Sequence, residues 1–196
     1  MGYCTKKVYY FDNPGKENTG DALRIGAERA GELGIGTIIV PSTSGATALR
    51  AYEELKGTGL NIVVVTHVVG FSSPGVWEFD GDLAERLKHC GVSIITGTHV
   101  LSGLERAFSA SPKIGGGSRS EAVAEALRRV VAVGLKVAVE CTLIAADQGI
   151  INIASEVISL GGTGNGVDTV CVIKPSSTSR FFDLQVREIV AMPRNR

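Results

Sequence analysis

The chain has 196 residues, with 20 Lys and Arg balanced by 20 Asp and Glu. This balance argues against a nucleic-acid-binding or membrane-surface protein, because both partners usually select a basic field. No window approaches the roughly 18 uninterrupted apolar residues of a membrane span. The length suits one domain over residues 1–196, and the N-terminal apolar run is too short for a signal peptide, so we expect a cytoplasmic protein.

The first half of the chain alternates between short apolar runs and helical patterns. Continuous apolar runs are typical of parallel strands buried on both faces, while apolar residues three and four apart indicate helices. The expected strands are 8–11, 37–40, 61–66 and 92–96, and the expected helices are 18–33, 46–55 and 80–89.

The second half is less regular. We expect a helical turn at 101–108, a loop at 111–117 and a helix at 118–133 that starts with a capping box from Ser118 to Glu121. The apolar stretch 135–147 is ambiguous and is read as helix. Strands follow at 156–160, 168–173 and 185–190, the last as an antiparallel edge strand after a reversal at 175–182. The pattern predicts a three-layer α/β/α fold with a mainly parallel sheet and an antiparallel strand near the C-terminus.

A hydroxyl-rich turn follows the predicted strand at 37–40. Right-handed crossovers place such turns together at one edge of a parallel sheet, where ligands bind. Backbone N–H groups and the dipole of the next helix favour an anion here, and Gly45 would allow close approach. Ordinary helix capping is the alternative. The residues of this candidate phosphate turn are Ser42, Thr43, Ser44, Gly45, Ala46 and Thr47.

Other residues are candidates for the same edge. A ring could stack on Phe71 or Trp77, and His67 could bind a ligand or transfer a proton, although a structural histidine is the alternative. His99 lies in a comparable loop. The remaining candidates are Thr66 and Gly70, Glu140 and Asp147 in the apolar stretch, and the glycine-rich segment 113–119 with Arg119. The four cysteines form no CxxC pair and the histidines add no usual ligand spacing, so we expect no metal site and reduced, mostly buried thiols.

Residues 18–70 resemble the C-terminal domain of pyruvate kinase. The likeness rests on an alanine-rich helix, a buried strand, the Ser44-Gly45 turn with Thr47, a second helix and a strand ending in Thr66. In that family the turn holds a phosphate of fructose bisphosphate, and the segment 160–166, with Gly162, resembles the second effector loop. This chain lacks the family's Lys and Arg in the turn, which disfavours fructose bisphosphate. The catalytic barrel is absent, so no pyruvate kinase activity is expected.

The whole chain resembles a group of stand-alone prokaryotic proteins of this fold. The shared motifs are similar to residues 99–106, 145–147 and 181–183. The resemblance implies binding of flavin mononucleotide (FMN), with its phosphate on the turn, and a homo-oligomer. A binding module and an enzyme remain open, the latter as a flavin-dependent oxidoreductase or a transferase acting on a phosphorylated metabolite. Phosphorylated small molecules, rather than nucleic acid or membranes, are the expected partners.

Overall fold

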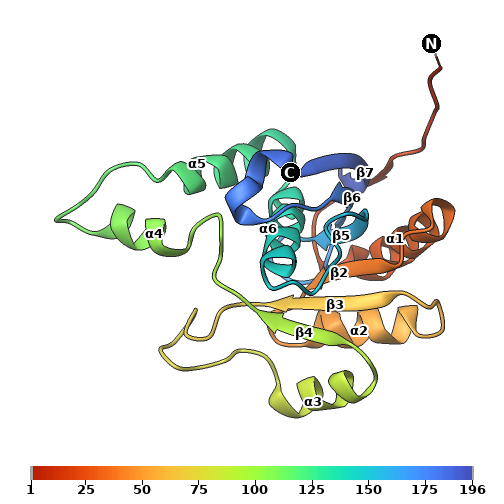
Figure 1. Ribbon diagram of the computed structural model, residues 1–196, viewed down its shortest axis with the longest axis horizontal. Helices are drawn as coiled ribbons and strands as arrows, with labels where there is room; N and C mark the ends of the chain where they lie inside the picture. The colour runs from red at the N-terminus through yellow and green to blue at the C-terminus, as the bar shows by residue number, and fades with distance from the viewer. Residues whose placement is uncertain (1, 196) are drawn as a thin grey trace.

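A mixed β-sheet forms the middle layer of the protein, and helices cover both of its faces (Figure 1). The computed structural model describes residues 2–195. The strands within this range are β1 (Tyr9–Phe11), β2 (Thr37–Pro41), β3 (Asn61–Thr66), β4 (Ser93–Thr96), β5 (Val157–Gly161), β6 (Thr169–Lys174) and β7 (Gln185–Pro193). The α-helices are α1 (Thr19–Leu33), α2 (Ala46–Leu55), α3 (Gly81–His89), α4 (Gly103–Ala110), α5 (Arg119–Ala126) and α6 (Val133–Asp147). Three shorter helical segments are η1 (Lys16–Asn18), η2 (Leu127–Val131) and η3 (Thr178–Asp183).

The sheet has the order β1-β7-β6-β5-β2-β3-β4. Strands β4, β3, β2 and β5 are parallel, β6 runs against them, and β7 and β1 return to the first direction. The predicted α/β/α fold with an antiparallel C-terminal region is therefore confirmed. The expectation that residues 185–190 form an edge strand is wrong, because β1 pairs with β7 and covers that edge. This pairing brings together strands near the two ends of the chain, so no local sequence pattern indicates it.

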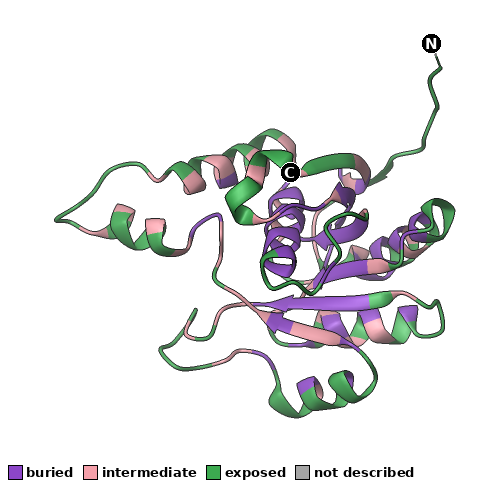
Figure 2. Ribbon diagram, in the orientation of Figure 1, coloured by how far each residue is buried: buried purple, intermediate pink, exposed green. Residues whose placement is uncertain are grey.

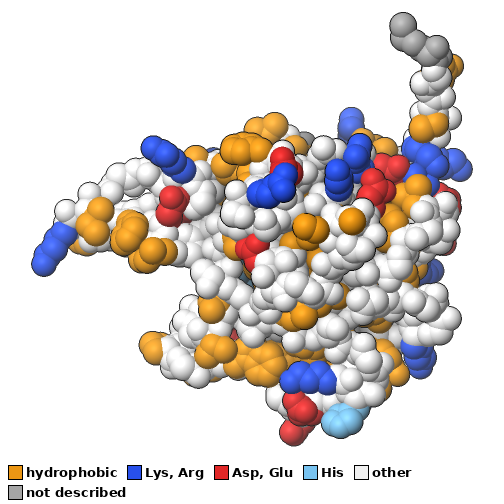
Figure 3. Space-filling model, viewed as in Figure 1, with side chains coloured by type: hydrophobic (Ala, Val, Ile, Leu, Met, Phe, Trp, Pro, Cys, Tyr) orange, Lys and Arg blue, Asp and Glu red, His pale blue; other side chains and the backbone are white. Residues whose placement is uncertain are grey.

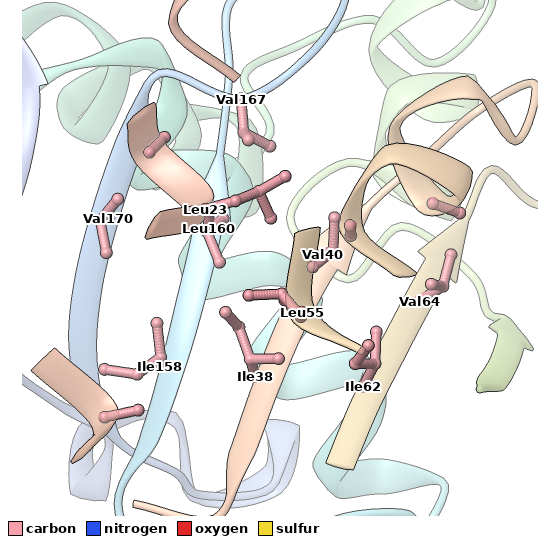
Figure 4. Close-up of a cluster of buried hydrophobic side chains, with 14 of the residues drawn as sticks. Leu23, Ile38, Val40, Leu55, Ile62, Val64, Ile158, Leu160, Val167 and Val170 are labelled. Atoms are coloured by element: carbon pink, nitrogen blue, oxygen red, sulfur yellow. The ribbon is translucent and has the colours of Figure 1, made fainter. Parts of the chain in front are cut away.

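Alternate residues of the buried strands face opposite helix layers. Ile38 and Val40 face the layer that contains α1 and α2, as Figure 4 shows with Leu23 and Leu55, whereas Ile39 faces α6. This alternation follows from the two-residue repeat of a strand. Because both faces are covered, the strands need apolar residues at every position, which explains their continuous apolar runs.

Helix α6 is the most deeply covered helix, and Figure 2 shows it buried over most of its length. Its burial on nearly all sides explains why residues 135–147 lack a clear amphipathic repeat, and the prediction of a helix there is confirmed. Gly134 lies against Gly161 of β5. A Cβ added at Gly161 would overlap the Gly134 carbonyl oxygen. None of the helices within residues 2–195 has the length and apolar character needed to cross a bilayer.

Two predicted helix starts differ in detail from the structure. The first expected helix begins at Thr19 rather than at residue 18, and Asn18 before it donates from Nδ2 to the Asn13 carbonyl at 2.8 Å. Ser118 caps α5 by accepting from the Glu121 N–H at 3.1 Å. The carboxylate at this helix start comes from Glu105 of α4 rather than from Glu121. Glu105 accepts from the Ser118 hydroxyl and from the N–H and hydroxyl of Ser120. These bonds hold the pKa of Glu105 at about 2 and tie the projecting helices α4 and α5 together.

Candidate ligand-binding site

A cavity of about 630 Å³ lies at the edge of the sheet where β2, β3 and β5 end. Its volume falls within the range of small-molecule sites. The structure brings together at this edge the segments that the strand–helix pattern placed there. The lining residues used below are Thr43, Ser44, Ala46, Thr47, Thr66, His67, Phe71, His99, Lys136, Glu140 and Gly162.

The turn between β2 and α2 opens onto one part of the cavity. The buried hydroxyl of Ser42 accepts from the N–H groups of Gly45 and Ala48, each at 3.2 Å, so it shapes the turn. The first-turn N–H groups of Ala46 and Thr47 have no acceptor within the helix. These groups, the helix dipole and the hydroxyls of the turn make this a suitable place for an anion.

Gly45 has a structural reason for being glycine. Its φ angle is 103°, in the left-handed region. A Cβ at this position would lie 2.7 Å from Leu83 Cδ2 and 3.1 Å from Phe79 Cε1. Packing against Leu83 and Phe79 therefore requires glycine here whether or not a ligand approaches, and Gly45 is not among the residues that line the cavity.

The polar side chains of Thr43, His67 and Glu78 lie next to one another in a row that begins at the turn. His67 Nε2 lies 3.4 Å from Thr43 Oγ1, and its Nδ1 lies 2.9 Å from Glu78 Oε2. The carboxylate fixes the orientation of the imidazole and favours a proton on Nδ1. A hydroxyl, an imidazole and a carboxylate in this order are suited to proton transfer at the hydroxyl.

Aromatic rings form one wall of the cavity. The rings of His67 and Phe71 are 4.2 Å apart, and Phe71 stacks on His99 at 5.1 Å. Trp77, the alternative stacking residue, stacks on Phe79 at 5.3 Å and donates to Thr66 Oγ1 at 3.1 Å. Trp77 therefore supports the β3 loop and does not line the cavity.

The floor of the cavity contains buried charge. Lys136 and Glu140, one turn apart on α6, form an ion pair, and their side chains are only 4% and 6% exposed. Glu140 Oε1 also accepts from the Leu101 N–H at 3.0 Å, and Oε2 lies 3.5 Å from His99 Nδ1. Burial opposes ionisation, but the hydrogen bonds and the charge of Lys136 outweigh it and hold the pKa of Glu140 at about 2. His99 Nε2 is buried without a partner among the described residues.

Residues 22–173 match the family described as pyruvate kinase, alpha/beta domain. The chain belongs to this family. The matched range contains the candidate phosphate turn, the aromatic wall, the buried ion pair and the glycine-rich loop after β5. It leaves out η1, whose Lys16 and Glu17 also line the cavity.

The glycine-rich loop forms another wall. Gly162 lines the cavity together with Gly164, Asn165 and Gly166. The buried carboxylate of Asp168 holds this loop, since its Oδ2 accepts from the N–H groups of Thr163 at 3.1 Å and Gly15 at 3.0 Å. The loop is thus fastened to the segment that precedes the matched range.

Sequence reasoning missed the cations of the site. The turn itself contains no Lys or Arg, but the fold adds five cationic side chains to the cavity lining: Lys16, Arg50, Arg106, Arg128 and Lys136. Lys136 could have been found from its i,i+4 spacing to Glu140 inside an apolar run, because a charge there needs a partner. Arg50 follows the turn on α2, whereas Lys16, Arg106 and Arg128 come from distant segments and give no local signal.

Several predicted candidates lie elsewhere. Asp147 accepts from the Thr178 N–H at 2.8 Å and ties α6 to η3. Gly70 forms a turn, donating to the Val76 carbonyl at 2.9 Å. Arg119 lines a separate cavity of about 250 Å³ between α5 and α6. No group of His, Cys, Asp and Glu within residues 2–195 is arranged to hold a metal ion.

The expectation of mostly buried cysteines needs correction. All four thiols are free, but two are exposed and two are buried. Burial raises the pKa of both Cys141 and Cys171 to about 12. These two thiols are therefore neutral core residues at ordinary pH.

Proposed function

We propose that the chain binds a phosphorylated small molecule, with its phosphate on the turn formed by residues 42–47, and that this ligand is FMN. One observation carries the proposal: a single cavity joins the N-terminus of α2 to a wall of aromatic rings. A phosphate and a flat ring in one molecule would use both features.

The phosphate end is supported by complementary groups. The N–H groups of Ala46 and Thr47 and the hydroxyls of Thr43 and Ser44 offer hydrogen bonds to a dianion. Hydrogen bonds to a charged group contribute about 1.5–3 kcal/mol each. Arg50, in the next turn of α2, adds positive charge to the same cavity. Several such interactions would support micromolar binding.

The ring end is supported by stacking surfaces. The rings of His67, Phe71 and His99 contact one another, with centroid distances of 4.2 Å for His67 and Phe71, 5.1 Å for Phe71 and His99, and 5.3 Å for His67 and His99. Aromatic contacts of this kind contribute about 0.5–1.5 kcal/mol beyond the burial of their area. A planar isoalloxazine ring offers a large face for such contacts, whereas a phosphorylated sugar alone would leave this wall unused.

Titration with FMN and with riboflavin tests the proposal. We expect FMN to bind at least about tenfold more tightly, since riboflavin lacks the phosphate. Thr47→Val should weaken FMN binding while leaving riboflavin unaffected, because it removes one hydroxyl of the turn and keeps the shape. Thr5→Val, in the exposed N-terminal segment, is the matched control. Equal binding of FMN and riboflavin would reduce the turn to a helix cap and overturn the proposal.

A transferase acting on a phosphorylated metabolite is the second candidate. The contacts from Thr43 through His67 to Glu78 favour it, because a hydroxyl beside an oriented imidazole can serve as a phosphoryl acceptor. Acid-quenched protein mixed with a phosphomonoester such as p-nitrophenyl phosphate would then carry phosphate on Thr43, detectable by mass spectrometry. The peptide from a His67→Gln variant should remain unmodified.

A flavin-dependent oxidoreductase is a variant of the FMN proposal. The cofactor would supply the electron chemistry, and the chain would supply binding and orientation. Reduction of bound FMN by a nicotinamide donor at a useful rate separates this enzyme from a binding module. Because the family match covers the alpha/beta domain, we expect no phosphorylation of ADP from phosphoenolpyruvate.

A further inference from the structure

The candidate phosphate turn and the buried ion pair are connected by a row of adjacent side chains. Thr43 of the turn lies 3.4 Å from His67, and the rings of His67 and His99 are 5.3 Å apart. His99 in turn lies 3.5 Å from Glu140, which pairs with Lys136. All five residues line one cavity, so a ligand held at the turn can extend along the rings to the ion pair.

His99 presents a hydrogen-bond acceptor at the end of this row. Its Nδ1 faces the Glu140 carboxylate, which can only accept. A neutral imidazole with its proton on Nδ1 has an acceptor at Nε2. This Nε2 is buried and has no partner among the residues that the structure describes. Buried polar atoms are nearly always paired, so the missing partner points to a donor on a ligand.

Lys136 presents hydrogen-bond donors beside this acceptor. Its ammonium group carries three N–H groups and pairs with Oε2 of Glu140. The side chain is only 4% exposed and lines the cavity, which leaves N–H groups for an acceptor on a ligand. The carboxylate of Glu140 touches both residues and therefore fixes the donor and the acceptor relative to each other.

We propose that Lys136 and His99 form a second recognition subsite, which binds the edge of a flat ring that carries neighbouring carbonyl and N–H groups. This assignment rests on the proposed function, because it assumes a phosphate held at the turn. The imide edge of the flavin ring has this chemistry, with one N–H between two carbonyl oxygens. Glu140 is a positioning residue that orients both ring-binding side chains.

Binding of FMN and 3-methyl-FMN tests the subsite. The methyl group removes the imide N–H and leaves the phosphate and the ring system in place. We expect the wild-type chain to bind FMN at least about tenfold more tightly than 3-methyl-FMN, because a site built around a hydrogen bond rejects an analogue that lacks it. His99→Phe keeps a ring beside Phe71 but removes the acceptor, so the preference should fall to about one. His89→Phe, on the exposed end of α3, is the matched control and should keep the preference.

The variant Lys136→Met/Glu140→Gln tests the donor without leaving an unpaired buried charge. It should weaken binding of FMN and 3-methyl-FMN while retaining the preference for FMN over riboflavin. Phosphate-dependent FMN binding with equal affinity for 3-methyl-FMN would overturn the subsite alone. A tenfold preference that survives in His99→Phe would reflect steric exclusion of the methyl group and would also overturn it. A wild-type chain that binds no FMN would overturn the proposed function and this assignment together.

Discussion

Replacement of Lys136 by Met should destabilise the protein through the carboxylate that it leaves behind. Methionine has a similar length and fills the space of the lysine stem, so the main loss is the charge. The partner, Glu140, has a side chain that is 6% exposed and would remain in the core without its cation. Buried charges without a partner are among the most costly features in a fold.

The size of the effect follows from the pKa of Glu140. Its pKa is lowered from 4.5 to about 2 by interactions that outweigh the cost of burial. A shift of this size corresponds to about 3 kcal/mol of stabilisation of the ionised form. Removing one partner of a buried pair costs about 3–5 kcal/mol in other proteins. We therefore expect Lys136→Met to lose about 3 kcal/mol of unfolding free energy at pH 7.

The effect should depend on pH. In the wild type the folded pKa of Glu140 lies below the unfolded one, so its stabilisation is present above about pH 4.5 and is lost as the pH falls toward 2. In the variant, burial persists while the charge of Lys136 is gone, so the pKa of Glu140 rises. Protonation of Glu140 then relieves the unpaired charge as the medium becomes acidic. The difference between wild type and variant should be smaller at pH 4 than at pH 7.

Urea unfolding at pH 7 and pH 4, followed by circular dichroism, measures this difference. Lys88→Met is the matched control, because Lys88 pairs with Glu85 on the exposed face of α3 and its loss should have little effect. Adding Glu140→Gln to Lys136→Met should restore most of the stability. A Lys136→Met variant as stable as the wild type at pH 7, or an equal loss at both pH values, would refute the reasoning.

Three further outcomes are expected. Gly161→Ala should lower the melting temperature strongly, because the added Cβ would overlap the Gly134 carbonyl oxygen. Gly36→Ala, at a position with open space around it, is the control and should have little effect. Equal melting temperatures of the two variants would contradict the close contact of α6 with β5. Thiol titration of the native protein should modify two cysteines and titration in urea all four; the two reactive ones should be Cys4 and Cys90. Light scattering at micromolar concentration should give the mass of a homo-oligomer, since apolar side chains are exposed on the projection formed by α4 and the following loop (Figure 3); a monomer mass would count against it. The exposed apolar residues of this projection are Leu104, Phe108 and Ile114.

The sequence by itself determined the layered fold and the place of the candidate phosphate turn. Continuous apolar runs such as 61–66 specify strands buried on both faces, and the helices between them require right-handed crossovers. These two rules place the loops after β2, β3 and β5 at one edge without any knowledge of tertiary contacts. They also place Thr43, Thr47 and His67 near one another, as the cavity lining shows.

The tertiary structure alone decided which side chains complete the site. The sequence pattern gave Gly45 a ligand-related role, but the position of Leu83 shows that packing requires the glycine. The sequence pattern treated Glu140 and Asp147 alike, but only Glu140 lines the cavity, whereas Asp147 accepts from the Thr178 N–H. Residues seven apart lie about two turns apart along a helix, so their neighbours differ. Lys16 and Arg106 reach the cavity from segments far from the turn. Local periodicity encodes which face of an element is buried, whereas contacts between distant segments depend on how the layers pack, and a single sequence carries no local signal for them.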